Sequence, residues 1–117
     1  MVEIRNLTPH PVAINGITYQ PEGIIPRITE VRESSVQLEG ITLERIFVGQ
    51  IDNLPKPDGC FLVVSREVAI KAHRPDVVCP CDYIRDNEGR IIGAKSIAWF
   101  PPPDISSEAL LIDDHKN

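Results

Sequence analysis

Proline and glycine interrupt this chain so often that long helices are disfavoured and short strands are favoured. Eleven prolines and seven glycines are spread over its 117 residues. Asn15-Gly16 separates two short apolar runs, residues 12–14 and 17–19, and this dipeptide is typical of a type I′ hairpin turn. The sequence therefore predicts a chain built largely from short strands and tight turns.

The extended segments are separated by polar loops and turn residues. They are residues 12–14, 17–19, 24–32, 36–39, 41–48, 61–64, 83–84, 91–92 and 97–100. Ser34-Ser35 is expected to end the third segment, and Gly40 separates two segments in which apolar and polar residues alternate. The run at 61–64 is continuously apolar, which predicts a strand buried on both faces. Residues 85–90 form a polar loop between two apolar pairs and predict another hairpin.

One helix is expected, over residues 66–73. Ser65 is a favourable N-cap, Glu67 lies in the first turn, and Lys71 and His73 lie in the last turn, where they complement the helix dipole. Pro75 forces the helix to end. We therefore predict a β-rich α+β fold, in which short and mainly antiparallel strands form a meander or a partly closed barrel with this one helix.

Length and charge set the domain organisation and the class of partner. Residues 1–103 are expected to form a single domain, and residues 104–117 an acidic tail. The net charge of −5 argues against binding along a nucleic-acid backbone, which needs a basic face. With no secretory signal, no spanning segment and three cysteines, we expect a cytoplasmic protein, with neither long nucleic acid nor membrane as partner.

Arginine content points instead to a small anionic ligand. The chain has eight arginines and four lysines, a bias toward planar donors that bind phosphate bidentately. Thr8-Pro9-His10-Pro11 is stiffened by its prolines and costs little entropy to order. The candidate ligand-binding residues are Asn6, Thr8, His10, Ser65, Arg66, Arg74, Asp76, Arg85 and Arg90. A plain N-cap at Ser65, surface ion pairs and a structural histidine are the alternative interpretations.

The cysteines give a weaker candidate site. Cys79 and Cys81, with Cys60 and His73 as further ligands, have the chemistry that zinc prefers. The Cys79-Pro80-Cys81 spacing is shorter than that of structural zinc sites, so partly buried thiols beside a proline turn are the alternative. Cys60 paired with a histidine would be a nucleophile, but no common catalytic motif is present in the sequence. We expect no cofactor, no resident metal and no catalytic residue.

Five segments resemble a known group of sequences. They are residues 6–12 (Asn-Leu-Thr-Pro-His-Pro-Val), 49–55, 64–69, 74–76 and 85–93. Together they resemble a family of small phage and bacterial proteins that open with Asn-Leu-Thr-Pro-His, over about residues 4–97. The chain departs from that family at Arg74-Pro75-Asp76, where Arg-Asp-Asp or Arg-Arg-Asp is common, and in having Cys79 and Cys81, which argues against a shared cysteine chemistry.

The resemblance implies a phage setting rather than an activity. Small phage proteins of this size include sponges that sequester nucleotide signals of bacterial immunity, so an anti-defence sponge is expected by analogy. The leading expectation is a homo-oligomeric, non-catalytic protein in the bacterial host cytoplasm that holds an anionic, nucleotide-like molecule. The alternative is an interaction or inhibitor module that docks on a host protein through residues 99–103 and the tail.

Overall fold

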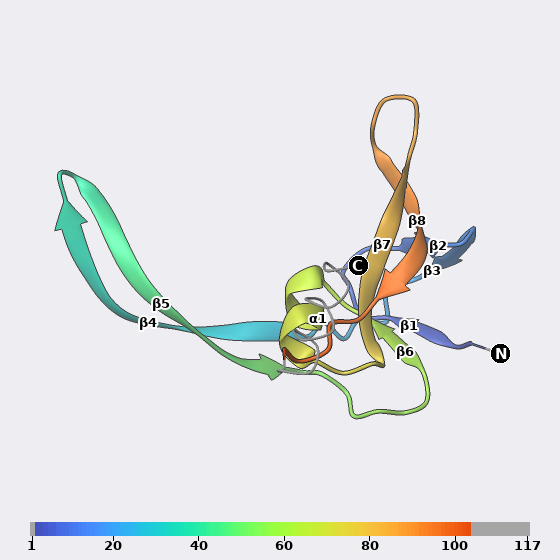
Figure 1. Cartoon of the computed structure of the whole chain (residues 1–117), viewed down its shortest axis with the longest axis horizontal. Helices are drawn as coiled ribbons and strands as arrows, with labels where there is room; N and C mark the ends of the chain where they lie inside the picture. Colours follow the sequence, from blue (N-terminus) through green and yellow to red (C-terminus); the bar gives the residue numbers. More distant parts are fainter. Residues whose placement is uncertain (1, 104–117) are drawn as a thin grey trace, which may run out of the picture.

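The computed structural model describes residues 2–103, so the predicted tail at 104–117 lies outside the described residues. Within that range the elements, in chain order, are β1 (Ile4–Asn6), β2 (Val12–Ile14), β3 (Ile17–Tyr19), β4 (Arg27–Leu38), β5 (Ile41–Asp52), β6 (Phe61–Val63), α1 (Arg66–Ala72), β7 (Val77–Arg85) and β8 (Ile91–Ala98). They form a six-stranded body with one helix and a separate two-stranded arm (Figure 1). In this part of the chain, no helix has the length and apolar character needed to cross a membrane.

The body is a sheet with strand order β1-β6-β7-β8-β2-β3. Strands β7 and β8 pair antiparallel, as do β2 and β3, whereas β1, β6 and β7 run parallel and one parallel bridge joins β2 to β8. A further bridge joins Asn6 to Pro21, just beyond β3, so the two ends of the sheet approach each other. The predicted β-rich fold with a partly closed barrel is therefore confirmed.

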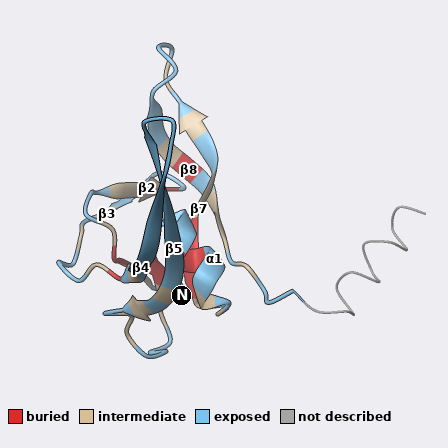
Figure 2. Ribbon diagram, turned by 90° about the vertical axis from the view of Figure 1, so that its left-hand side faces the viewer, coloured by how far each residue is buried: buried red, intermediate tan, exposed pale blue. Residues whose placement is uncertain are grey.

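The core lies on both faces of β6, as its apolar sequence predicts. Leu62 and Val64 pack with Val68 and Ala69 of α1 on one face, and Val63 packs with a second cluster on the other. Buried residues gather where β6, β7 and α1 meet (Figure 2). The packing of Val68 and Ala69 against this cluster stabilises the short helix, whose seven residues would be marginal in isolation.

Local turn and cap predictions are confirmed. Asn15 and Gly16 both have positive φ between the paired residues Ile14 and Ile17, as a type I′ turn requires. Ser65 caps α1 and accepts a hydrogen bond from the Val68 amide at 3.4 Å. His73 is the left-handed C-cap, so the helix proper ends at Ala72.

The arm is a hairpin formed by β4 and β5, and it extends away from the body (Figure 1). Its base is fixed where Ile28 and Ile51 pack against the core. The expectation that Ser34-Ser35 ends a strand was wrong, because β4 continues from Arg27 to Leu38. A register shift between Arg32 and Ser34 inserts one extra residue as a β-bulge, which lets pairing continue through a polar segment.

Two further sequence expectations were also wrong. Cys79, Pro80 and Cys81 lie inside β7 rather than beside a turn. Among the described residues, strand β6 pairs with β7 only at Val77 and Val78. Pro80 lies beyond this pairing, so its lack of an amide hydrogen removes no hydrogen bond to β6. The last strand, β8, runs from Ile91 to Ala98 and excludes residues 99–100. The ring of Phe100 instead lies under the Arg66 guanidinium, 5.1 Å from its centroid.

Candidate functional site

The predicted ligand residues are distributed over four parts of the body. Asn6, Thr8 and His10 lie together in and after β1, and Ser65 and Arg66 begin α1. Arg74 and Asp76 lie between α1 and β7, whereas Arg85 and Arg90 lie at the tip of the β7–β8 hairpin. The four arginines are therefore not gathered around one site.

Asn6 is buried, with 1% of its surface exposed, and its side chain is hydrogen-bonded within the chain. Its Nδ2 donates to the carbonyl oxygens of His10 at 2.7 Å and Tyr19 at 2.9 Å. Its Oδ1 accepts from the backbone amide of Thr8 at 2.9 Å and from the Thr8 hydroxyl at 2.7 Å. An amide group has two donors and two acceptor positions, so the Asn6 side chain has no hydrogen bond left for a ligand.

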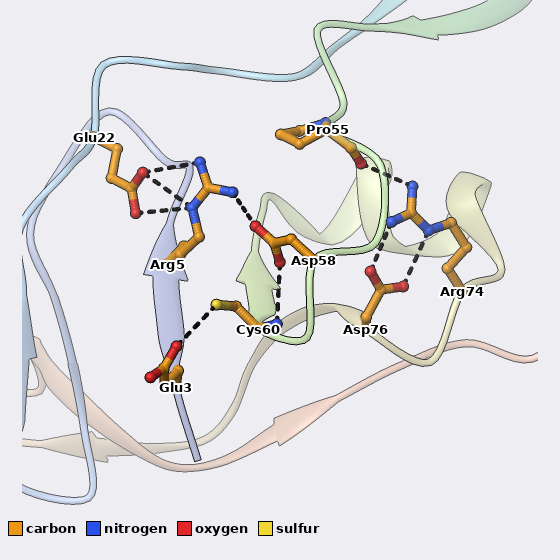
Figure 3. A network of polar contacts seen from close by, with 8 residues as sticks. All are labelled: Glu3, Arg5, Glu22, Pro55, Asp58, Cys60, Arg74 and Asp76. Atoms are coloured by element: carbon orange, nitrogen blue, oxygen red, sulfur yellow. Dashed lines mark hydrogen bonds and ion pairs between the residues drawn. The ribbon is translucent and has the colours of Figure 1, made fainter. Parts of the chain in front are cut away.

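The arginines after the helix and at the hairpin tip bind groups of the chain itself. Arg74 forms a bidentate pair with Asp76, at 3.0 and 2.6 Å, and donates to the Pro55 carbonyl oxygen at 3.1 Å (Figure 3). Arg85 donates to the Gly89 carbonyl oxygen at 2.8 Å, and Arg90 pairs with Asp86 at 3.0 Å. These contacts fix loops, and a phosphate would have to compete with them.

Arg5 forms a network that was not predicted from the sequence. Its guanidinium pairs with Glu22 at 3.0 Å and with Asp58, whose other oxygen accepts from the Cys60 amide at 3.0 Å (Figure 3). These bonds join β1 to two loops that lie 17 and 53 residues away along the chain. The hydrogen bond from Cys60 and the pairing with Arg5 lower the pKa of Asp58 below its usual value of 3.8.

The lowered pKa of Asp58 predicts an acid-sensitive contribution to stability. Such a carboxylate stabilises the fold above its unfolded-state pKa, and the contribution is lost as the pH falls through the lowered value. Asp58→Asn should therefore lower the melting temperature at pH 7. The difference in melting temperature between the variant and the native protein should shrink and disappear as the pH falls below about 4. Thermal melts from pH 7 to pH 2 measure it, with Asp52→Asn at the end of β5 as the control for losing one carboxylate. A gap that stays constant down to pH 2 would contradict the prediction.

The cysteines do not form a metal site or an activated nucleophile in the described residues. Across residues 2–103, no cluster of three or more His, Cys, Asp or Glu side chains could hold a metal ion. Burial raises the pKa of the Cys79 thiol. Burial and the Glu3 carboxylate raise the pKa of the Cys60 thiol, whose Sγ lies 3.4 Å from the Glu3 Oε2. Both shifts favour the thiol over the reactive thiolate.

A cleft of about 580 Å³ lies at the base of the arm, beside the start of α1. Thr8 and Ser65 line it, so the cleft brings together two of the predicted ligand residues. Arg27 contributes one positive charge, but Glu30 and Glu67 also line the cleft. The volume suits a small molecule, whereas the two carboxylates disfavour an anion.

The arm itself presents an apolar surface. Cross-strand partners lie on the same face of a hairpin, and the side chains alternate along each strand. The β4–β5 register therefore places six apolar side chains on one face, together with the Ser34/Arg45 pair that lies among them. This face, here called the arm face, contains Val31, Val36, Leu38, Ile41, Leu43 and Phe47. Between 43% and 69% of each of these residues is exposed (the exposed arm is seen in Figure 2).

The opposite face of the arm is polar over its outer half. The Gln37 side chain donates to the Thr42 hydroxyl at 2.7 Å, and Arg32 pairs with Glu44 at 2.8 Å. Ile46 and Val48 lie on this face nearer the base. The outer arm is therefore an amphipathic hairpin, and none of the described residues of its own chain covers its apolar side.

No family model, curated protein or solved structure matches this chain.

The arm face was missed by sequence reasoning, although one signal for it was present. Residues 36–39 and 41–44 alternate apolar and polar side chains around Gly40. Glu39 and Gly40 both have positive φ and form the turn, so alternation in both strands lines up on one face. Alternation of this kind normally indicates a half-buried strand, whereas none of residues 2–103 covers the apolar side of the arm.

Proposed function

We propose that this chain is a protein-interaction module that docks through the arm face. The proposal depends on one observation. Six apolar residues on one face of a projecting hairpin are each about half exposed to solvent. Soluble monomers rarely expose contiguous apolar surface of this kind unless it is an interaction site.

The construction of the arm supports the same proposal. A two-stranded hairpin is at best marginally stable in water, and a third layer is normally needed to order it. Only the base of this hairpin packs on the body, through Ile28 and Ile51, among the described residues. A protein layer over the arm face would supply the missing contacts along its outer half.

The contacts of the arginines give less support to capture of a small anion. Arg74 and Arg90 are paired with carboxylates, and Arg85 binds a carbonyl oxygen of its own loop. Capture of an anionic, nucleotide-like ligand therefore stays a prediction, with the cleft beside Thr8 and Ser65 as the place to examine.

Two matched variants test docking through the arm face. The face variant combines Val36→Lys with Leu43→Glu, a cross-strand pair on the apolar side. The back variant combines Gln37→Lys with Thr42→Glu, the neighbouring pair on the polar side. Each variant adds one positive and one negative charge, so the net charge of the chain is unchanged.

We expect chemical cross-linking in cells to join the native chain and the back variant to the same protein, at similar yield. The face variant should lose at least about 90% of that product, because charged side chains cannot be buried in an apolar interface without a large desolvation cost. Equal cross-linking of all three chains would contradict docking through this face.

A further inference from the structure

We propose that the occupant of the arm face is the arm of a second copy of this chain. This inference rests on the proposed function and names the partner of that same surface. The two arms would stack face to face and run antiparallel about a two-fold axis. The apolar sides would then form an inner layer, and both polar sides would remain in water.

The arm face is complementary to itself in this arrangement. From the tip inward, its cross-strand pairs are Leu38/Ile41, Val36/Leu43, Ser34/Arg45 and Val31/Phe47. A two-fold axis between the second and third pairs would place the aliphatic tip of each arm on the Phe47 end of the other. Aliphatic side chains would thus cover the aromatic ring twice, by symmetry.

The charges on the arm permit this contact. Within β4 and β5, Arg45 is the charged residue that shares the arm face, and its guanidinium lies 5.0 Å from the centroid of the Phe47 ring. In the proposed arrangement Arg45 faces the Val36/Leu43 pair of the second copy. Because β5 is an edge strand of the two-stranded arm, the Arg45 stem can lie on this apolar surface while its guanidinium stays in water at the rim of the contact. Each full chain carries a net charge of −5, so two copies repel each other, and physiological salt screens this repulsion over distances of about 8 Å.

The area of the arm face is enough for a reversible dimer. Residues 31–38 span about 25 Å at ~3.3 Å per residue, and two strands are about 10 Å wide. That footprint is about 250 Å², but the six apolar residues project from it and together expose the area of about three fully exposed apolar residues, roughly 500 Å² per face. Two such faces would bury about 1,000 Å², which is at the lower limit for specific interfaces. We therefore expect a dimer with a dissociation constant of roughly 10 μM rather than an obligate one.

Sedimentation velocity from about 1 to 100 μM tests the inference. The native chain and the back variant should shift from monomer to dimer over this range, whereas the face variant should stay monomeric, a loss of at least about tenfold in affinity. A native chain that remains monomeric at 100 μM, or a face variant that dimerises like the native chain, would overturn the proposed partner.

Hydrogen exchange at 1 and 100 μM locates the contact, even if the face variant fails to order its arm. In the native chain, amides of residues 31–38 and 41–48 should become more protected at the higher concentration, and those of β6 should not change. Protection of the arm that is independent of concentration would indicate cover by its own chain and would also overturn the inference.

The two proposals fail differently. If the native chain is monomeric but cross-links to another protein through the arm face, the second copy is rejected and docking stands. If neither dimerisation nor cross-linking depends on the arm face, both proposals are rejected.

Discussion

Replacing Asn6 with alanine is expected to lower the free energy of unfolding by about 3 kcal/mol, which is a large share of the roughly 5–15 kcal/mol typical of a domain. The substitution removes four hydrogen bonds and leaves the Tyr19 carbonyl oxygen and the Thr8 amide without their Asn6 partner, while the His10 carbonyl oxygen keeps the Thr8 hydroxyl at 3.0 Å. These groups belong to three segments that Asn6 joins: β1, the proline-stiffened loop and β3. Chemical denaturation followed by circular dichroism measures the change.

Two other substitutions serve as comparisons for the change in the free energy of unfolding. Thr8→Val removes one hydroxyl of the same network and should cost about 1 kcal/mol. Asn87→Ala lies in the exposed β7–β8 loop and should change stability by less than about 0.5 kcal/mol. An Asn6→Ala protein as stable as Asn87→Ala would show that the network is not structural.

The hydrogen bonds of Asn6 also indicate the role of the whole Asn-Leu-Thr-Pro-His segment. Asn6 was predicted to contact a ligand, but its side-chain polar atoms are all used in hydrogen bonds that shape the loop. Leu7, the next residue, is buried in the core. His10 is exposed at the surface of the loop that this network holds. The segment is therefore a scaffold, and only its exposed side chains are available to a partner.

Local patterns predicted the elements whose determinants are close together in sequence. Asn15-Gly16 specifies its turn through the positive φ values that both residues tolerate. Ser65 specifies the start of α1 because its side chain bonds an amide three residues on. The apolar run at 61–64 specifies a buried strand because no polar face remains to be solvated.

Contacts between distant residues could not be predicted in this way. The parallel pairing of β1 with β6 joins residues more than fifty positions apart, and no local pattern encodes it. The bulge at Glu33 allows β4 to continue through Ser34-Ser35, although those residues disfavour a strand locally. Arginine content alone did not reveal the partners of Arg5 or Arg74, so potential ligand donors could not be separated from loop-fixing ion pairs.

Shortening the arm is expected to abolish dimerisation and leave the body folded. Residues 33–45 would be replaced by Asn-Gly, which joins the cross-strand partners Arg32 and Ile46 in the way that Asn15-Gly16 joins Ile14 and Ile17. The removed segment contains most of the arm face, but none of the residues that form or pack against the two core clusters. The melting temperature should therefore stay within about 4 °C of the native value, equivalent to roughly 1 kcal/mol.

Sedimentation at 100 μM and a thermal melt of this shortened chain separate the roles of arm and body. A monomer that melts like the native body is the expected result, because the core clusters lie around β6 and β7 whereas four of the six apolar residues of the arm face lie beyond Arg32 and are removed. A shortened chain that unfolds would show that the outer arm supports the core despite its exposure. A shortened chain that still dimerises would move the contact to the body, where the exposed Tyr83, Ile91 and Ile92 of the β7–β8 hairpin offer another apolar surface.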